Sequence, residues 1–147
     1  MPAAEVGSIE RTTTVLAMAQ PKPSPPAVLV IEDDEDVAMT INDVVEERGY
    51  RAICVPNGKA ALSVLEREHP ALMLVDLFMP VMNGAEFLKV VKRTPSLASI
   101  PRVIMTAAND PMIGIKEDVT VLYKPVDFEA LTRLLHMYCG SYAARAQ

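Results

Sequence analysis

The sequence ALMLVDLFMP, residues 71–80, contains the most informative carboxylate of the chain. Its first five residues form a continuous apolar run, which is typical of a strand buried on both faces of a parallel sheet. Asp76 closes that run as a lone carboxylate. A carboxylate in this place is either a turn residue or a reactive group. The polar residues at the ends of the other apolar runs bear on that choice.

Short apolar runs alternate with segments of helical spacing from residue 27 onward. Strands are predicted over 28–31, 51–55, 71–75, 102–105 and 119–123. Helices are predicted over 37–48, 59–68, 84–93 and 128–138, with a weak, Gly-interrupted segment over 111–118. Strands and helices alternating through short links predict an α/β fold with a doubly wound parallel sheet covered on both faces.

The ends of the predicted helices carry recognisable signals. Asp34 or Asp36 is the expected N-cap of the first helix, and Gly49 its stop. Asn57 and the glycine after it form a turn and cap before the second helix, which should end at His69 because a proline follows.

Five polar residues lie at the ends of the apolar runs. Right-handed crossovers place the carboxyl ends of all parallel strands on one edge, and ligand sites in such sheets lie on that edge. We therefore expect these five side chains to converge: Glu32, Asp33, Asp76, Thr106 and Lys124.

The acidic run after the first strand suits a divalent cation. Adjacent carboxylates repel each other unless a cation or solvent compensates, and Mg²⁺ binds one or two carboxylates with waters and a phosphoryl oxygen. The simpler explanation, that acids favour a helix N-terminus, fits Glu35 and Asp36. It fits Glu32 and Asp33 less well, because they precede the helix.

Asp76 has the chemistry of a nucleophile toward phosphorus, since a carboxylate can form an acyl phosphate when a cation offsets the repulsion between anions. Lys124 and Thr106 can contact the same phosphoryl oxygens. Taken singly, the three residues are also explained as a turn aspartate, a surface lysine and a turn threonine. Their occurrence together favours a common site.

Composition narrows the function classes. The 147 residues are enough for one domain, with a net charge of −5 and a pI near 5.0. No stripe of Lys and Arg is present, so a nucleic-acid partner is not expected. No apolar run approaches the ~20 residues of a membrane span, so membrane insertion is not expected.

The proline-rich segment and the two cysteines indicate the domain organisation and the cellular location of the protein. Residues 1–26 include PKPSPP and are expected to form a flexible extension, leaving residues 27–147 as the domain. Cys54 and Cys139 lack the spacing of a zinc site and are expected to be reduced thiols of a cytoplasmic protein.

At residues 27–140 the chain resembles the receiver domain of bacterial two-component response regulators, in the single-domain form of the chemotaxis regulators. The resemblance rests on five blocks in order: VLVIEDD (28–34), NGKAAL (57–62), VDLFMP (75–80) with Gly84, VIMTA (103–107) and YKP (123–125). Each block is weak alone, and the ordered set is specific.

The resemblance implies a flavodoxin-like fold with a five-stranded sheet of order 2-1-3-4-5 and five helices. It implies that Asp76 accepts a phosphoryl group from a phosphohistidine of a sensor histidine kinase or a phosphotransfer protein. It also implies a Mg²⁺ site, which Mn²⁺ can share, formed by Asp33, Asp76 and the backbone carbonyl of Phe78, with Glu32 acting through water.

The same resemblance gives the remaining residues their roles. Lys124 pairs with Asp76 before transfer and with the phosphoryl group afterwards, and its bond to Pro125 is expected to be cis. Thr106 moves onto the phosphoryl group as the switch, and Ala107 is the small residue that leaves access to the site.

Two departures from the family pattern concern how the phosphorylated domain would pass on its signal. Val121 occupies the switch position where many members carry Tyr or Phe, and the stretch 106–124 is shorter than usual by roughly one helical turn. The usual dimer face, and with it a phosphorylation-dependent homodimer, stays an open alternative. With only a short tail after the last helix, we expect a stand-alone, non-turnover phosphoacceptor that signals through an unknown protein target.

Two other functions compete with this one. A pseudo-receiver would be an interaction module without phosphorylation, which the intact set of five polar residues argues against. An aspartyl phosphatase needs a second acid two residues after the nucleophile, where Phe78 stands. Phe78 and Ala108 also lack side chains that orient attacking water, so slow self-dephosphorylation is expected.

Overall fold

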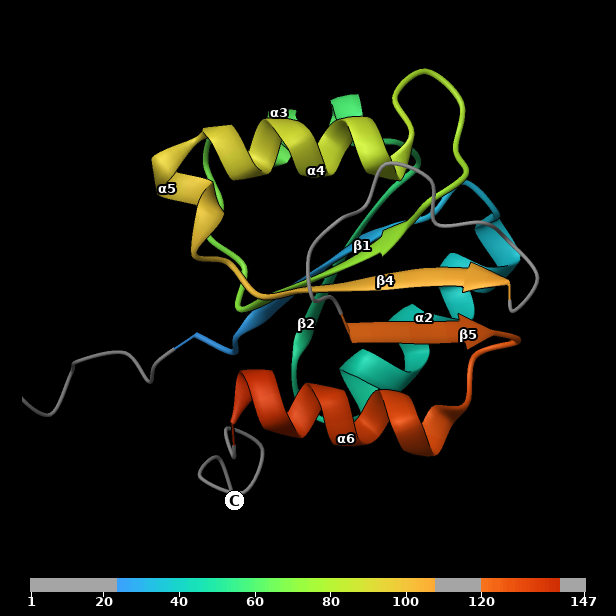
Figure 1. The fold of residues 1–147 in the computed structure, drawn as a ribbon. Helices are drawn as coiled ribbons and strands as arrows, with labels where there is room; N and C mark the ends of the chain where they lie inside the picture. Colours follow the sequence, from blue (N-terminus) through green and yellow to red (C-terminus); the bar gives the residue numbers. More distant parts are fainter. Residues whose placement is uncertain (1–23, 108–119, 141–147) are drawn as a thin grey trace, which may run out of the picture.

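A single parallel sheet forms the centre of the molecule in the computed structural model, which describes residues 24–107 and 120–140 (Figure 1). The strand order is β2-β1-β3-β4-β5, and every neighbouring pair is parallel. The predicted order is thereby confirmed. The strands are β1 (Ala27–Ile31), β2 (Arg51–Val55), β3 (Leu72–Asp76), β4 (Arg102–Ala107) and β5 (Thr120–Lys124).

Helices cover both faces of the sheet, as the alternating pattern predicts. Helices α3 and α4 lie on one face, and α2 and α6 lie on the other (Figure 1). The described helices are α2 (Glu35–Glu47), α3 (Gly58–Leu65), α4 (Gly84–Arg93), the short α5 (Pro95–Ala98) and α6 (Phe128–Cys139).

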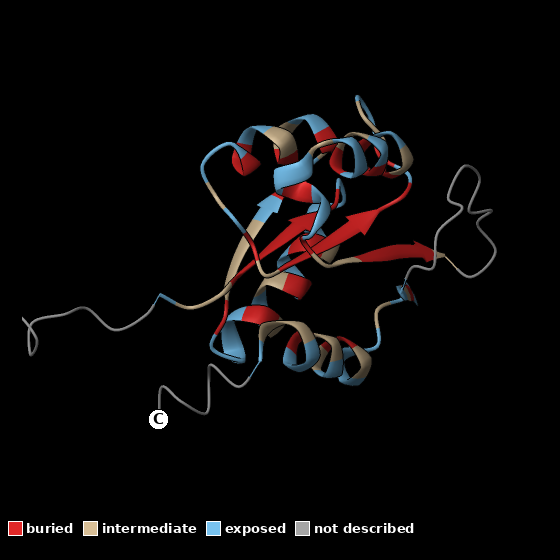
Figure 2. Cartoon of the chain, turned by 60° about the vertical axis from the view of Figure 1, so that its left-hand side comes forward, coloured by how far each residue is buried: buried red, intermediate tan, exposed pale blue. Residues whose placement is uncertain are grey.

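The sheet separates two apolar cores. All residues of β1 and β3 are buried, because these strands have neighbours on both sides and helices on both faces (Figure 2). Phe87 and Ile104 belong to the core under α3 and α4, whereas Leu131 and Leu135 belong to the core under α2 and α6. Burial of this kind contributes about 25 cal/mol per Å² of apolar surface removed from water.

Side-chain caps fix where the helices begin. Asp34 is the N-cap of α2, and its Oδ1 accepts from the backbone N–H of Asp36 at 2.9 Å. Asn57 caps α3 in the same way, as predicted. At α4, Asn83 and Glu86 form a reciprocal capping box. These caps place the β1–α2 and β3–α4 loops at the carboxyl edge of the sheet.

Some predicted boundaries are wrong. The second helix ends at Leu65 and not at residue 68. The N–H groups of Glu66 and Arg67 bond three residues back, to Ser63 and Val64, and so interrupt the helical pattern before Glu68 bonds to Val64 again. Helix α5 was not expected from the pattern; its Pro95 supplies the fixed backbone angle of a first helical turn.

Other expectations have mixed outcomes. The Lys124–Pro125 bond is cis, as predicted. The weak segment 111–118, Ala108 and the extension up to residue 23 lie outside the described residues. Within the described ranges, the helices are too short or too polar to cross a membrane.

Candidate functional site

The carboxyl edge of the sheet brings the predicted polar residues together. Asp76 is the last residue of β3, Lys124 is the last of β5, and Thr106 lies near the end of β4. Glu32 follows β1 directly and continues its pairing, since its N–H donates to the carbonyl of Val55 at 3.0 Å. The strand ends therefore bring these residues to one edge of the sheet, as expected.

Lys124 joins two acids, one that follows β1 and one at the end of β3. Its Nζ donates to Oε1 of Glu32 at 2.8 Å and to Oε2 at 3.1 Å, and it lies 3.2 Å from Oδ2 of Asp76. The side chain of Glu32 is fully buried and that of Asp76 is 6% exposed. Charge pairs in such an enclosed place interact more strongly than pairs in water.

Three carboxylates could hold a metal ion. One oxygen each from Glu32, Asp33 and Asp76 lie within 4.8 Å of one another. Glu32 and Asp76 are buried, whereas Asp33 is exposed and open to solvent. An all-oxygen set with an open side suits Mg²⁺, which keeps several waters.

The site holds more negative charge than Lys124 alone offsets. Burial raises the pKa of Glu32 to about 8, and a hydrogen bond with Asp76 adds to the rise, while Lys124 opposes it. Burial alone would lower the pKa of Lys124, but Glu32 and Asp76 together raise it. A divalent cation bound between these carboxylates would offset the repulsion between their negative charges.

The backbone after Asp76 also faces its carboxylate. The N–H of Phe78 donates to Oδ1 of Asp76 at 3.3 Å, while the Phe78 side chain is 54% exposed. On the neighbouring strand, Thr106 is buried and lies in register with Tyr123 of β5. Val121, two residues before Tyr123, packs against the core under α3 and α4.

The β3–α4 loop contains a strained turn at Val81. Its φ is 70°, and among the described non-glycine residues it is the one with positive φ. The N–H of Met82 donates to the carbonyl of Pro80 at 2.8 Å across Val81. This combination is typical of a γ-turn, a rare conformation that is costly for a β-branched residue.

Two glycines lock the same loop in place. A Cβ added at Gly84 would lie 2.4 Å from the backbone oxygen of Asp76 and 2.8 Å from the Cα of Leu77. The N–H of Gly84 donates to the carbonyl of Leu77 at 2.9 Å, and that of Gly58 donates to the carbonyl of Met82 at 3.1 Å. The loop is therefore held at both ends by backbone contacts, close to Asp76.

A sequence model of the response regulator receiver domain matches residues 28–136. The chain belongs to the response regulator receiver family. The match spans most of the chain and includes residues of all five described strands.

Curated relatives agree with this assignment. The receiver is 34% identical over 122 residues to the polar-differentiation response regulator DivK of Brucella anthropi, covering 79% of this chain and 98% of that protein. It is 30% identical over 115 residues to sporulation initiation phosphotransferase F of Bacillus subtilis, covering 76% of this chain and 91% of that protein.

Solved structures share the fold. The receiver domain of a sensor histidine kinase from Pseudomonas aeruginosa PAO1, with a magnesium ion coordinated in its active-site cleft, matches with a TM-score of 0.72. The match covers 80% of this chain and 100% of that one at 24% identity, so it supports the fold alone.

The receiver's sequence did not point to the two most constrained positions of the β3–α4 loop. Val81 is an ordinary apolar residue in the sequence, and its positive φ appears only in the folded loop. Gly84 belongs to a block of the resemblance, but its approach to the backbone of Asp76 depends on the fold. Pro80 stands three positions before the Asn83–Gly84 pair, and this spacing is a turn signal that was available in the sequence.

Replacing Val81 with glycine should stabilise the receiver. Relief of the left-handed backbone is worth roughly 1–2 kcal/mol, and the greater freedom of glycine in the unfolded chain cancels roughly 0.5–1 kcal/mol. We expect a net gain of about 0.5–1 kcal/mol in the free energy of unfolding, measured by urea denaturation.

Val81→Ala is the matched control, because it shortens the same exposed side chain but keeps the Cβ that causes the strain. It should leave stability close to that of the wild type. A lower stability of Val81→Gly than of Val81→Ala would show that the turn is not strained.

Proposed function

We propose that the receiver accepts a phosphoryl group on Asp76 from a phosphohistidine of a sensor histidine kinase or a phosphotransfer protein. The observation that carries this proposal is the convergence of Glu32, Asp76 and Lys124, with an ammonium group 3.2 Å from the carboxylate that would react. Curated relatives include a phosphotransferase and a sensor histidine kinase by name, which supports the donor class.

In this reaction a carboxylate oxygen of Asp76 attacks phosphorus as the bond between phosphorus and the histidine nitrogen breaks. The electron pair of that bond stays with the imidazole, which leaves, and the protein gains an acyl phosphate. Lys124 is placed to neutralise charge on the transferred oxygens. Thr106 is proposed to move onto the phosphoryl group as the switch, with Val121 at the position of the family's aromatic residue.

A divalent cation belongs to the proposed site. Asp33, Asp76 and the backbone carbonyl of Phe78 would hold Mg²⁺ or Mn²⁺, with Glu32 acting through water. The clustered carboxylate oxygens and the raised pKa of Glu32 fit such an ion. When bound, the cation would offset the repulsion between the Asp76 carboxylate and the incoming phosphoryl oxygens.

Asp33→Asn should weaken Mg²⁺ binding by about tenfold or more, because it removes one of the anionic ligands from a set of hard-cation ligands. Titration calorimetry of the unphosphorylated protein measures this directly. Asp43→Asn removes an exposed carboxylate of α2 outside the carboxylate cluster and serves as the control. Equal affinity in the two variants would exclude Asp33 as a ligand.

The test of the proposed function is phosphate uptake by the wild-type protein. The protein is incubated with Mg²⁺ and phosphoramidate, and in parallel with a panel of phosphorylated histidine kinases and phosphotransfer proteins. Mass spectrometry should then detect an acid-stable, base-labile phosphate. No uptake from either source would refute the proposal and favour the pseudo-receiver.

We expect the phosphorylated receiver to lose its phosphate slowly. Phe78 places an apolar side chain, 54% exposed, beside the path of attacking water, where a polar group would orient that water. The decay of isolated phosphoprotein, followed by mass spectrometry in Mg²⁺ buffer, should take minutes or longer. Phe78→Asn should shorten it several-fold. Decay of the wild-type phosphoprotein within seconds would contradict this expectation.

The proposal also covers the arrangement of the chain and the compartment in which it acts. Residues 27–147 act as the signalling domain and residues 1–26 as an extension. The match to nearly all of DivK supports this arrangement. The receiver is a non-turnover phosphoacceptor that works in the cytoplasm through a protein target, and the free thiols of Cys54 and Cys139 are consistent with that compartment.

A further inference from the structure

The side chain of Val81 has no evident use within the described protein. It is 75% exposed and belongs to neither apolar core. The turn itself is held by backbone hydrogen bonds, from Met82 to Pro80 and from Gly58 to Met82, which residues of other types can form equally well. A β-branched residue in this conformation therefore costs stability and gains no burial in return.

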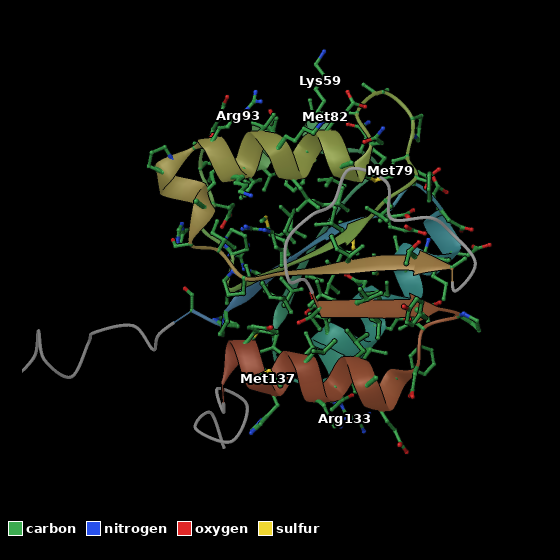
Figure 3. The ribbon with its side chains drawn as sticks, in the orientation of Figure 1. Lys59, Met79, Met82, Arg93, Arg133 and Met137 are labelled. Atoms are coloured by element: carbon green, nitrogen blue, oxygen red, sulfur yellow. The ribbon has the colours of Figure 1, made fainter. Side chains whose placement is uncertain are left out.

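Val81 stands at the border of a groove beside α3. The groove encloses about 550 Å³, and its lining includes Lys59, Ala60 and Leu62 of that helix. Ala60 and Leu62 are partly buried against the core, so their remaining surface offers apolar contact. Figure 3 shows Lys59 pointing away from the sheet on the side where Met82 of the loop lies.

The same loop presents a second exposed apolar side chain next to the phosphoacceptor. Phe78 is 54% exposed, and its N–H contacts the Asp76 carboxylate. Phe78 and Val81 lie three residues apart in one loop, whose ends are held at Gly58 and Gly84. Any protein that contacts both Phe78 and Val81 therefore lies directly beside Asp76.

We propose that Val81, with Phe78 and the groove beside α3, is a docking contact for the protein that donates the phosphoryl group. This inference rests on the proposed function. A donor must bring its phosphohistidine to bond-forming distance of Asp76, and so must cover this edge of the sheet. A small apolar contact on a rigid loop fits a donor that binds and leaves, because transient interfaces are small. A second copy seated here would obstruct the donor.

The test compares two phosphodonors on two variants. Val81→Thr keeps the shape and the backbone strain but removes apolar surface; Val81→Gly removes both. With phosphoramidate, both variants should take up phosphate within twofold of the wild-type rate. With the panel donor that phosphorylates the wild type fastest, both should lose about five- to tenfold in kcat/KM, mainly through KM.

Met137→Thr is the control, because Met137 is 68% exposed on α6, on the other side of the sheet (Figure 3). It should match the wild type with both donors. A wild-type kcat/KM for Val81→Thr with the protein donor would overturn the docking contact. A loss of kcat/KM in Val81→Gly alone would also overturn it, because that result would assign the effect to the backbone strain. If no panel donor acts on the wild type although phosphoramidate does, the docking proposal fails and phosphorylation of Asp76 stands.

A second copy as the occupant is tested separately. Sedimentation of wild type and Val81→Thr, each phosphorylated with phosphoramidate, should give the same mass. A dimer lost in Val81→Thr while transfer from the protein donor is unchanged would assign the contact to a second copy and overturn the proposal.

Discussion

Replacing Asp76 with asparagine should abolish phosphorylation, lowering the rate of phosphate uptake by about a thousandfold or more. The amide is a poor nucleophile toward phosphorus and removes one of the negative charges that face Lys124. The measurement is mass spectrometry after incubation with Mg²⁺ and phosphoramidate, and then with a phosphorylated donor protein.

The fold of this variant should persist. Asp76 and asparagine have nearly the same shape, and the N–H of Phe78 retains an oxygen acceptor. Asp43→Asn makes the same chemical change at an exposed position on α2 and should be phosphorylated like the wild type. Phosphate on the Asp76→Asn protein at the wild-type level would place the acceptor on another residue.

Gly84→Ala should cost about 3 kcal/mol of stability, the upper end of what overpacking usually costs. The new Cβ would lie 2.4 Å from the backbone oxygen of Asp76, at a point where neither atom belongs to a flexible side chain. The loop or the end of β3 must move, so phosphate uptake should fall as well. Urea denaturation gives the first quantity and mass spectrometry gives the second.

Gly58→Ala is the matched control for this change. Its Cβ would approach the Cγ and Sδ of Met82 and the Cβ of Phe87 at 2.9 to 3.0 Å. The methionine side chain can move aside, whereas the buried Phe87 must shift slightly with α4. We expect a cost of about 1–2 kcal/mol, because no backbone atom stands in the way of the new Cβ. If the two variants lose equal stability, the backbone contact at Gly84 is not decisive.

The sequence was enough to predict a parallel sheet and the edge on which the site lies, because both follow from periodicity and connectivity, whereas the strand order was implied by the family resemblance. Continuous apolar runs mark central strands, and the residue after each run must lie at the carboxyl edge of a parallel sheet. Asp76 and Lys124 could therefore be assigned to one edge although 48 positions separate them in the chain.

Other features of the site could not be predicted, because they depend on contacts between atoms far apart in the sequence and on which charged groups pair in the folded site. The bidentate pairing of Lys124 with Glu32 depends on the position of each side chain in the folded site. Helix α3 ends early because its last turn tightens, a local choice that the apolar pattern does not encode. Pro80 and the Asn83–Gly84 pair indicate a turn, but they do not show that Val81 takes the left-handed backbone, because that conformation is not a property of valine.

Lys124 links the middle of the sheet to its border. It belongs to β5, an outermost strand, yet its ammonium group passes over β4 to reach acids on β3 and after β1. Among the described residues, β5 has no strand on its outer side, so a change of charge at Asp76 would be felt by an edge strand. The contacts of Lys124 thus connect the acids of the site to the border of the sheet.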